Sequence, residues 1–266
     1  MKINKFTSLF ATCLLMGLTA CSNDNVSDAD SNNSAENKDL TGKTSFSSEA
    51  KTRTSGVYDG SGVDFYWTTN DNIWVNSGSA TSPTLTASSS NNITSTTASA
   101  KFYFDGTYTA ESYPVRYTGN ANTSGNTVTI ATSQNQDEAN KATQLGTVGD
   151  CGVGTATRQT DGSYKFTLSH EASYITFMPY YSKEELDASA VVTQINVTAA
   201  NGESLAGTFN FSDSGLGTAN SSSNSVTLTL NGTSSETGFP IPKAATASKN
   251  AAIMVVAPGT YSTFKV

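Results

Sequence analysis

The sequence predicts an all-β protein, and two features of its composition carry this prediction. Thr, Val, Tyr and Phe, which favour strands, recur at alternate positions, while Gly, Asn and Ser fill the segments between them. Charged residues make up only 14% of the chain, so the Glu- and Lys-rich polar faces of a helical bundle are missing. The net charge of −7 would be repelled by phosphate backbones, which argues against a nucleic-acid partner.

The first 20 residues are typical of a secretory signal peptide. Lys2 and Lys5 precede an apolar run from Leu9 to Leu18. This run is shorter than the roughly 20 residues that a membrane-spanning helix needs. A basic start, a short apolar core and small residues before a polar segment are the layout of a cleaved signal. We therefore assign residues 1–20 to a signal peptide.

Leu18-Thr19-Ala20-Cys21 resembles the lipobox of bacterial lipoproteins. The resemblance implies that a signal peptidase cuts before Cys21 and that this residue carries the lipids, palmitate among them. Several acyl chains would make the attachment permanent, whereas a single chain binds a membrane reversibly. Ser22 and the acidic residues after it resemble sorting signals that imply a surface-exposed lipoprotein of the cell outer membrane. The alternative is an ordinary secretory signal followed by a chance cysteine.

Residues 21–42 contain almost no apolar side chains, so we expect a disordered polar tether. Beyond it, alternating or continuous apolar patterns predict strands near residues 44–46, 63–67, 73–75, 102–104, 113–117, 128–130, 164–177, 191–197, 208–211, 226–230, 251–257 and 261–266. Ser182 to Leu186 matches a capping box and predicts one short helix. We place a domain boundary there, between residues 43–184 and 185–266. Because the chain stops at Val266 inside a strand pattern, we expect the second domain to be truncated.

The most informative strand pattern runs from Tyr164 to Phe177. Alternate residues from Tyr164 to Ala172 would share one face, but the apolar positions then move by one residue to Ile175 and Phe177. Such a slip turns side chains to the opposite face of a sheet. A bulge or a strand break is therefore predicted between residues 171 and 174.

Catalytic and metal sites are not favoured by the sequence. The single histidine, His170, lies between Ser169 and Glu171, but successive strand residues point to opposite faces and cannot form a relay. A dyad of His170 with Cys151, the one cysteine expected in the folded body, is the remaining option. Zinc needs about four nitrogen or sulfur ligands, more than these residues supply. We expect no enzyme, no cofactor, no metal site and, with one body cysteine, no internal disulfide.

Several motifs, taken in order, resemble the fimbrillin family of Bacteroidales surface lipoproteins, the subunits of type V pili and their relatives. They follow the lipobox and are listed here: Thr52-Arg53-Thr54; Trp67-x-x-x-Asp71-x-Ile73; Tyr113-Pro114; Val128-Thr129-Ile130 with Gln134-x-Gln136; Phe166-x-Leu168-x-His170-x-Ala172; and Leu205-Ala206-Gly207. The resemblance implies two consecutive transthyretin-like β-sandwich domains. It also implies that an arginine-specific protease cuts at Arg53, near the first strand, and that a strand of a neighbouring subunit fills the groove left behind. The alternative is that Arg53 is an ordinary surface arginine.

The resemblance implies a lipid-anchored surface protein with a structural or adhesive role, as a pilus subunit, an anchor or a standalone lipoprotein. Its expected partners are the outer membrane, other pilus subunits, and glycans or proteins of host or bacterial surfaces. The alternative function is a carbohydrate-binding or spacer domain of a longer surface lipoprotein. Trp67, Trp74, Tyr180 and Tyr181 motivate that alternative, because aromatic rings can stack on sugars, although most such rings in a sandwich belong to the core.

Overall fold

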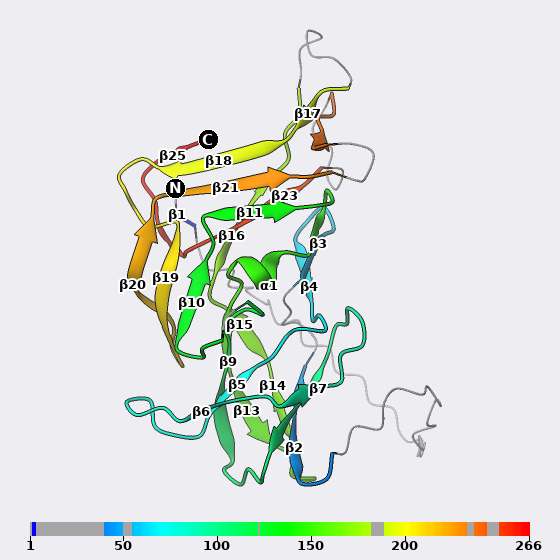
Figure 1. The fold of residues 1–266 in the computed structure, drawn as a ribbon, viewed down its shortest axis with the longest axis vertical. Helices are drawn as coiled ribbons and strands as arrows, with labels where there is room; N and C mark the ends of the chain where they lie inside the picture. The colour runs from blue at the N-terminus through cyan, green and yellow to red at the C-terminus, as the bar shows by residue number, and fades with distance from the viewer. Residues whose placement is uncertain are drawn as a thin grey trace, which may run out of the picture.

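A computed structural model describes residues 2–3, 40–49, 55–121, 123–181, 189–232, 237–243 and 250–266. Among the described residues the fold is nearly all β, with 51% in strands and 2% in helix. The predicted fold class is therefore confirmed at the level of an all-β, sandwich-like architecture (Figure 1). Within the described ranges, no helix is long and apolar enough to span a membrane. The signal peptide beyond Lys2 and Ile3, the tether up to residue 39 and the capping box lie outside the described residues.

The largest sheet has nine strands and fills the lower half of Figure 1. Its order is β6 (Leu85–Ala87), β5 (Trp74–Asn76), β9 (Ser112–Tyr117), β13 (Gly152–Arg158), β14 (Tyr164–Phe166), β2 (Lys43–Ser48), β8 (Lys101–Asp105) and β7 (Ser90–Asn91), with β15 (Leu168–His170) also paired to β13. Its buried side chains form what we call the aromatic core, which includes Phe46, Trp67, Phe102, Phe104, Tyr117, Tyr164 and Phe166. This sheet contains most of the predicted strands of the first half of the chain.

The upper half of Figure 1 is built from smaller sheets. One joins β10 (Thr127–Ile130), β19 (Ala206–Ser212) and β20 (Gly215–Ser223), and another joins β11 (Ser133–Gln136), β21 (Ser225–Leu230), β18 (Gln194–Ala199) and β25 (Phe264–Lys265). Shorter pairings are β12 (Lys141–Ala142) with β3 (Ser55–Tyr58) and β4 (Val63–Tyr66), β16 (Ser173–Phe177) with β23 (Ala252–Val256), β17 (Val191–Val192) with β22 (Phe239–Pro240), and β1 (Lys2–Ile3) with β24 (Gly259–Thr260). The one helical turn among the described residues is α1 (Leu145–Val148). These elements enclose the aliphatic core, which is rich in Val, Ile, Leu and Ala.

The two cores do not divide at the expected boundary after residue 184. Strands β10 and β11 pair with β19 and β21, and β16 pairs with β23, so strands before the boundary complete sheets formed after it. Val128, Leu145 and Cys151 belong to the aliphatic core together with residues from 195 to 261. The sequence pattern indicates where strands are but not which sheet each one joins, so the boundary after residue 184 stays a prediction.

A buried arginine ties the two halves together. Arg116 of β9 is 2% exposed, and its Nε donates to Asp213 Oδ1 at 2.6 Å. Its Nη1 donates to the carbonyl oxygens of Gly125 and Phe211 at 2.9 and 3.0 Å and to Asn126 Oδ1 at 3.0 Å. Charge-assisted bonds of this kind are roughly twice as strong as neutral ones. They fix the hairpin of β19 and β20 against the nine-stranded sheet.

The predicted break in the strand from Tyr164 to Phe177 is confirmed. Strand β15 ends at His170 and pairs with β13, whereas β16 begins at Ser173 and pairs with β23 in the other half of the molecule. Tyr164, Phe166, Leu168 and Ala172 are all buried. The slip in the pattern therefore marks the point where the chain passes from one core to the other.

Two glutamines act as a substitute strand for the fully buried β23. Gln134 Nε2 donates to Val255 O at 2.7 Å and its Oε1 accepts from Val255 N at 2.9 Å. Gln136 Oε1 accepts from Ile253 N at 2.7 Å, and its Nε2 donates to Ala251 O at 3.1 Å. Buried backbone groups need such partners, and among the described strands β23 is paired with β16 on its opposite edge. This arrangement gives the Gln-x-Gln motif a structural role.

We predict that Gln134→Met lowers the free energy of unfolding by about 3 kcal/mol, because it leaves a buried N–H and C=O of Val255 unpaired. Asn135→Ala is the matched control, since the Asn135 side chain is exposed on the opposite face of β11, and it should change stability by less than about 0.5 kcal/mol. Urea unfolding of both variants measures the difference. Equal stabilities would show that the amide pairing contributes nothing.

Candidate functional site

Strand β2 occupies a middle position in the nine-stranded sheet. It pairs in parallel with β14, where Phe46 lies opposite Tyr164, and antiparallel with β8, where Phe46 lies opposite Phe102. Glu49 follows β2 directly, and β3 begins at Ser55, so residues 50–54 connect the two. A middle strand is thus joined to the rest of the body on its C-terminal side through one short segment.

Arg53 lies inside that segment, and it is therefore the predicted site residue closest to β2 in sequence. Arg53 and the predicted lipidation site Cys21 both fall outside the described residues. Both assignments stay predictions. The position of β2 nevertheless gives a cut at Arg53 a definite consequence: residues up to 53, β2 included, would be held to the body by non-covalent contacts alone.

The inner face of β2 carries two buried side chains, Phe46 and Ser48. Phe46 has no exposed surface and is surrounded by aromatic rings of the core. Ser48 Oγ accepts from Trp67 Nε1 at 2.8 Å and from Ala100 N at 2.9 Å. On the outer face, Lys43 forms an ion pair with Asp105 at 2.5 Å. Burial and hydrogen bonding therefore hold β2 mainly through residues 46 and 48.

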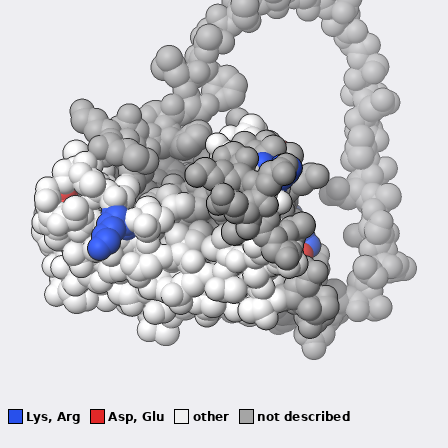
Figure 2. Space-filling view, turned by 90° about the horizontal axis from the view of Figure 1, so that it is seen from above, with Lys and Arg blue, Asp and Glu red and all other residues white. Residues whose placement is uncertain are grey.

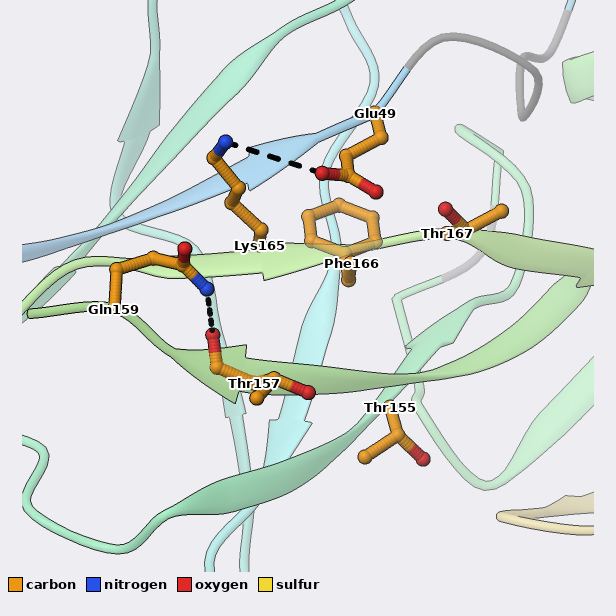
Figure 3. Close-up of a pocket in the computed structure, with 7 residues that line it drawn as sticks. All are labelled: Glu49, Thr155, Thr157, Gln159, Lys165, Phe166 and Thr167. Atoms are coloured by element: carbon orange, nitrogen blue, oxygen red, sulfur yellow. Dashed lines mark hydrogen bonds and ion pairs between the residues drawn. The ribbon is translucent and has the colours of Figure 1, made fainter. Parts of the chain in front are cut away.

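A polar hollow of about 350 Å³ lies where β2 ends (Figure 3). Its lining residues are Glu49, Thr155, Thr157, Gln159, Lys165, Phe166 and Thr167. Lys165 Nζ lies 3.9 Å from Glu49 Oε1, and both side chains are about half exposed, so the pair is solvated and contributes little. Gln159 Nε2 donates to Thr157 O at 2.9 Å. The hollow brings together hydroxyls, an amide and one solvated ion pair, which is not a catalytic constellation.

A second hollow, of about 280 Å³, is apolar and lies at the end of the molecule formed by β18 and β25. It is lined by Phe177, Met178, Pro179, Val192, Ile195 and Val266. Strand β25 pairs only with Thr198 and Ala199 of β18, so among the described strands none covers Gln194 to Val197 on that edge. Figure 2 views the molecule from above in Figure 1 and shows few charged side chains among the described residues.

The candidate sugar-stacking residues are largely covered. Trp67 has no exposed surface, and the ring of Trp74 packs so closely on Gly125 that a Cβ there would lie 2.9 Å from ring atoms. Tyr180 is 55% exposed, and Tyr181 is half-buried. The four aromatic side chains therefore do not form one exposed platform of the kind that binds a sugar chain.

His170 belongs to a partly buried polar cluster around the fully buried Asp150, which the sequence did not reveal. Its Nδ1 lies 2.9 Å from Asp150 Oδ1 and 3.0 Å from the Tyr174 hydroxyl, which itself donates to Asp150. The ring of Phe65 packs on His170 with a centroid distance of 4.1 Å. Asp150 and Cys151 have no exposed surface, so the thiol offers a substrate no access. The dyad of His170 and Cys151 gains no support from this geometry.

The cluster pins the chain where it passes between the two cores. Asp150 precedes β13, His170 ends β15 and Tyr174 lies in β16. Burial, and then the charge of Asp150, raise the pKa of Tyr174 well above 10. The hydroxyl therefore stays protonated and donates a hydrogen bond to the side chain of Asp150. Sequence spacing gave no signal for this cluster, because Asp150 lies 20 residues from its histidine in a glycine-rich loop.

Tyr174→Phe should lower the free energy of unfolding at neutral pH by about 1–3 kcal/mol, because a buried carboxylate loses a donor. The difference from the native chain should shrink above about pH 10. There the unfolded tyrosine ionises while the folded one stays protonated, so only the native chain loses this contribution as pH rises. Urea unfolding at several pH values tests this. Tyr180→Phe, at an exposed tyrosine, is the control, and a pH-independent gap for Tyr174→Phe would contradict the assignment.

Comparison with known proteins adds no relative to this geometry. No protein-family model, no curated protein and no solved structure matches the chain.

Proposed function

We propose that this chain is a lipid-anchored, surface-exposed, fimbrillin-like protein of the outer membrane with a structural or adhesive role, which assembles by strand exchange. The observation that carries the proposal is the placement of β2, a middle strand of the largest sheet, directly before the segment that contains Arg53. An unpaired edge accepts an extended strand through main-chain hydrogen bonds. Removal of β2 would leave two such edges, on β14 and β8, facing each other.

A single cut after Arg53 has two coupled consequences in this arrangement. The lipid on Cys21 and strand β2 lie on the same side of the cut. The cut therefore leaves the body attached to its anchor only through β2, so departure of β2 both releases the body from the membrane and opens the groove. A body released from the membrane carries an open groove, which a strand from a neighbouring subunit fills.

The chain offers an arginine-specific protease few other targets. It has three arginines, Arg53, Arg116 and Arg158. Arg116 is 2% exposed, and Arg158 lies at the end of β13, where it pairs with Tyr164 and its N–H bonds to Glu111 O at 2.9 Å. A protease binds its substrate backbone through hydrogen bonds, and the backbone of Arg158 already uses these groups within the sheet. Arg53 is the remaining candidate.

Membranes that carry the full chain should release a body starting at Thr54 when treated with an arginine-specific protease. The released body should form oligomers that mass spectrometry shows to lack residues 21–53. Arg53→Ala should stay membrane-bound and monomeric, while the matched variant Arg158→Ala should behave like the native chain. Release without oligomers, or release from Arg53→Ala as well, would contradict the proposal.

A further inference from the structure

The groove that β2 fills contains two separate recognition positions. We propose that it selects an incoming strand by two side chains two residues apart: an aromatic ring in place of Phe46 and a hydroxyl in place of Ser48. This inference rests on the proposed strand exchange and names the chemistry of the partner segment. Residues at i and i+2 of a strand share one face, so a single extended segment can supply both groups.

At the first position, four aromatic side chains surround Phe46, and we call them the aromatic box. The Tyr164 ring stacks on Phe46 with a centroid distance of 4.5 Å and an interplanar angle of 8°. Phe104 and Tyr108 present edges to it at 4.9 and 5.3 Å, and Tyr113 lies at 6.3 Å. Such pairs add specific energy beyond area burial. A flat ring fits between these neighbours, whereas an aliphatic side chain loses the stacked contact.

The four rings of this aromatic box also contact one another. Its members contact one another, Phe104 with Tyr108 at 5.8 Å, Tyr108 with Tyr113 at 5.2 Å and Tyr113 with Tyr164 at 5.4 Å. Tyr164 donates its hydroxyl proton to Ala110 O at 2.6 Å, and the Tyr113 hydroxyl accepts from the N–H groups of Thr109 and Ala110. None of these bonds involves β2. The contacts among Tyr108, Tyr113 and Tyr164 therefore favour a preorganised site for a new ring, which reduces the entropy lost on binding.

The second position, at Ser48, requires a side chain that accepts hydrogen bonds. Trp67 is fully buried, and its Nε1–H bonds to Ser48 Oγ at 2.8 Å; the N–H of Ala100 bonds to the same oxygen at 2.9 Å. A strand with an apolar residue there would leave two buried donors without an acceptor, and such groups oppose binding. Ser47 instead points to the other face of the sheet, so it does not distinguish one strand from another.

The test uses the full chain cut at Arg53 and a labelled peptide of residues 40–49, Leu40 to Glu49, in competition with unlabelled variants. Phe46→Ala should bind about 100-fold more weakly, since it leaves the box empty. Phe46→Leu and Ser48→Ala should each bind about tenfold more weakly. Ser47→Ala is the matched control and should lie within about twofold of the native peptide.

Two contrary results are distinguishable. If the native peptide enters the groove but Phe46→Leu binds as well as it does and Ser48→Ala equals Ser47→Ala, the groove accepts any apolar strand. The inference is then wrong while strand exchange stands. If the cut chain never exchanges its own strand for the labelled native peptide, strand exchange itself fails, and the inference fails with it.

Discussion

The structure depends on the middle strand β2 of the nine-stranded sheet. A short segment, residues 49–54, connects this strand to the rest of the body on its C-terminal side. Strand β2 satisfies the facing edges of β14 and β8 and buries Phe46 among four rings. Burial of one phenylalanine contributes about 2–3 kcal/mol, and each ring contact adds about 0.5–1.5 kcal/mol. The sum is comparable with the whole stability of a typical domain, about 5–15 kcal/mol. Binding of another strand by a body that lost β2 would therefore be strongly favourable in free energy.

Other parts of the molecule are held by contacts that do not involve β2. Arg116 and Asp213 fix the β19–β20 hairpin to the nine-stranded sheet, and the cluster of Asp150, His170 and Tyr174 holds the chain where it crosses between the cores. The substitute strand formed by Gln134 and Gln136 keeps β23 paired on both sides. None of these contacts involves residues of β2. These contacts therefore stabilise the side of the sheet that carries β14 and the smaller sheets independently of β2.

Part of this could be read from the sequence, because strands leave a period-two pattern. The alternation from Tyr164 to Ala172 predicted both a buried face and the break after it, and both are confirmed. The Trp67, Asp71 and Ile73 motif also has a local logic: Trp67 and Ile73 are core residues, and Asp71 accepts from Thr68 N at 2.6 Å and from the Tyr117 hydroxyl at 2.8 Å. Motifs of this type specify the fold rather than a reaction.

What the sequence could not supply was pairing over long distances. Nothing near Asp150 indicates His170, and nothing near Arg116 indicates Asp213. Phe46 and the four rings of the aromatic box come from strands and a loop spread over more than 100 residues. The same limit applies to the pairing of β10, β11 and β16 with strands after residue 184, since strand patterns do not identify their partner strands. Cys21 and Arg53 remain predictions from local motifs, and the position of β2 gives Arg53 a mechanical meaning that the motif alone lacked.

The central claim, that β2 must leave before the chain assembles, can be tested most directly by a reversible clamp. Ser45 of β2 lies opposite Tyr103 of β8, and the Tyr103 carbonyl faces Ser89 on the far side. The pair is therefore a close, non-hydrogen-bonded one, suited to a disulfide. After cleavage at Arg53, the double variant Ser45→Cys and Tyr103→Cys should stay monomeric when oxidised and assemble once reduced. Equal assembly in both redox states would contradict the account.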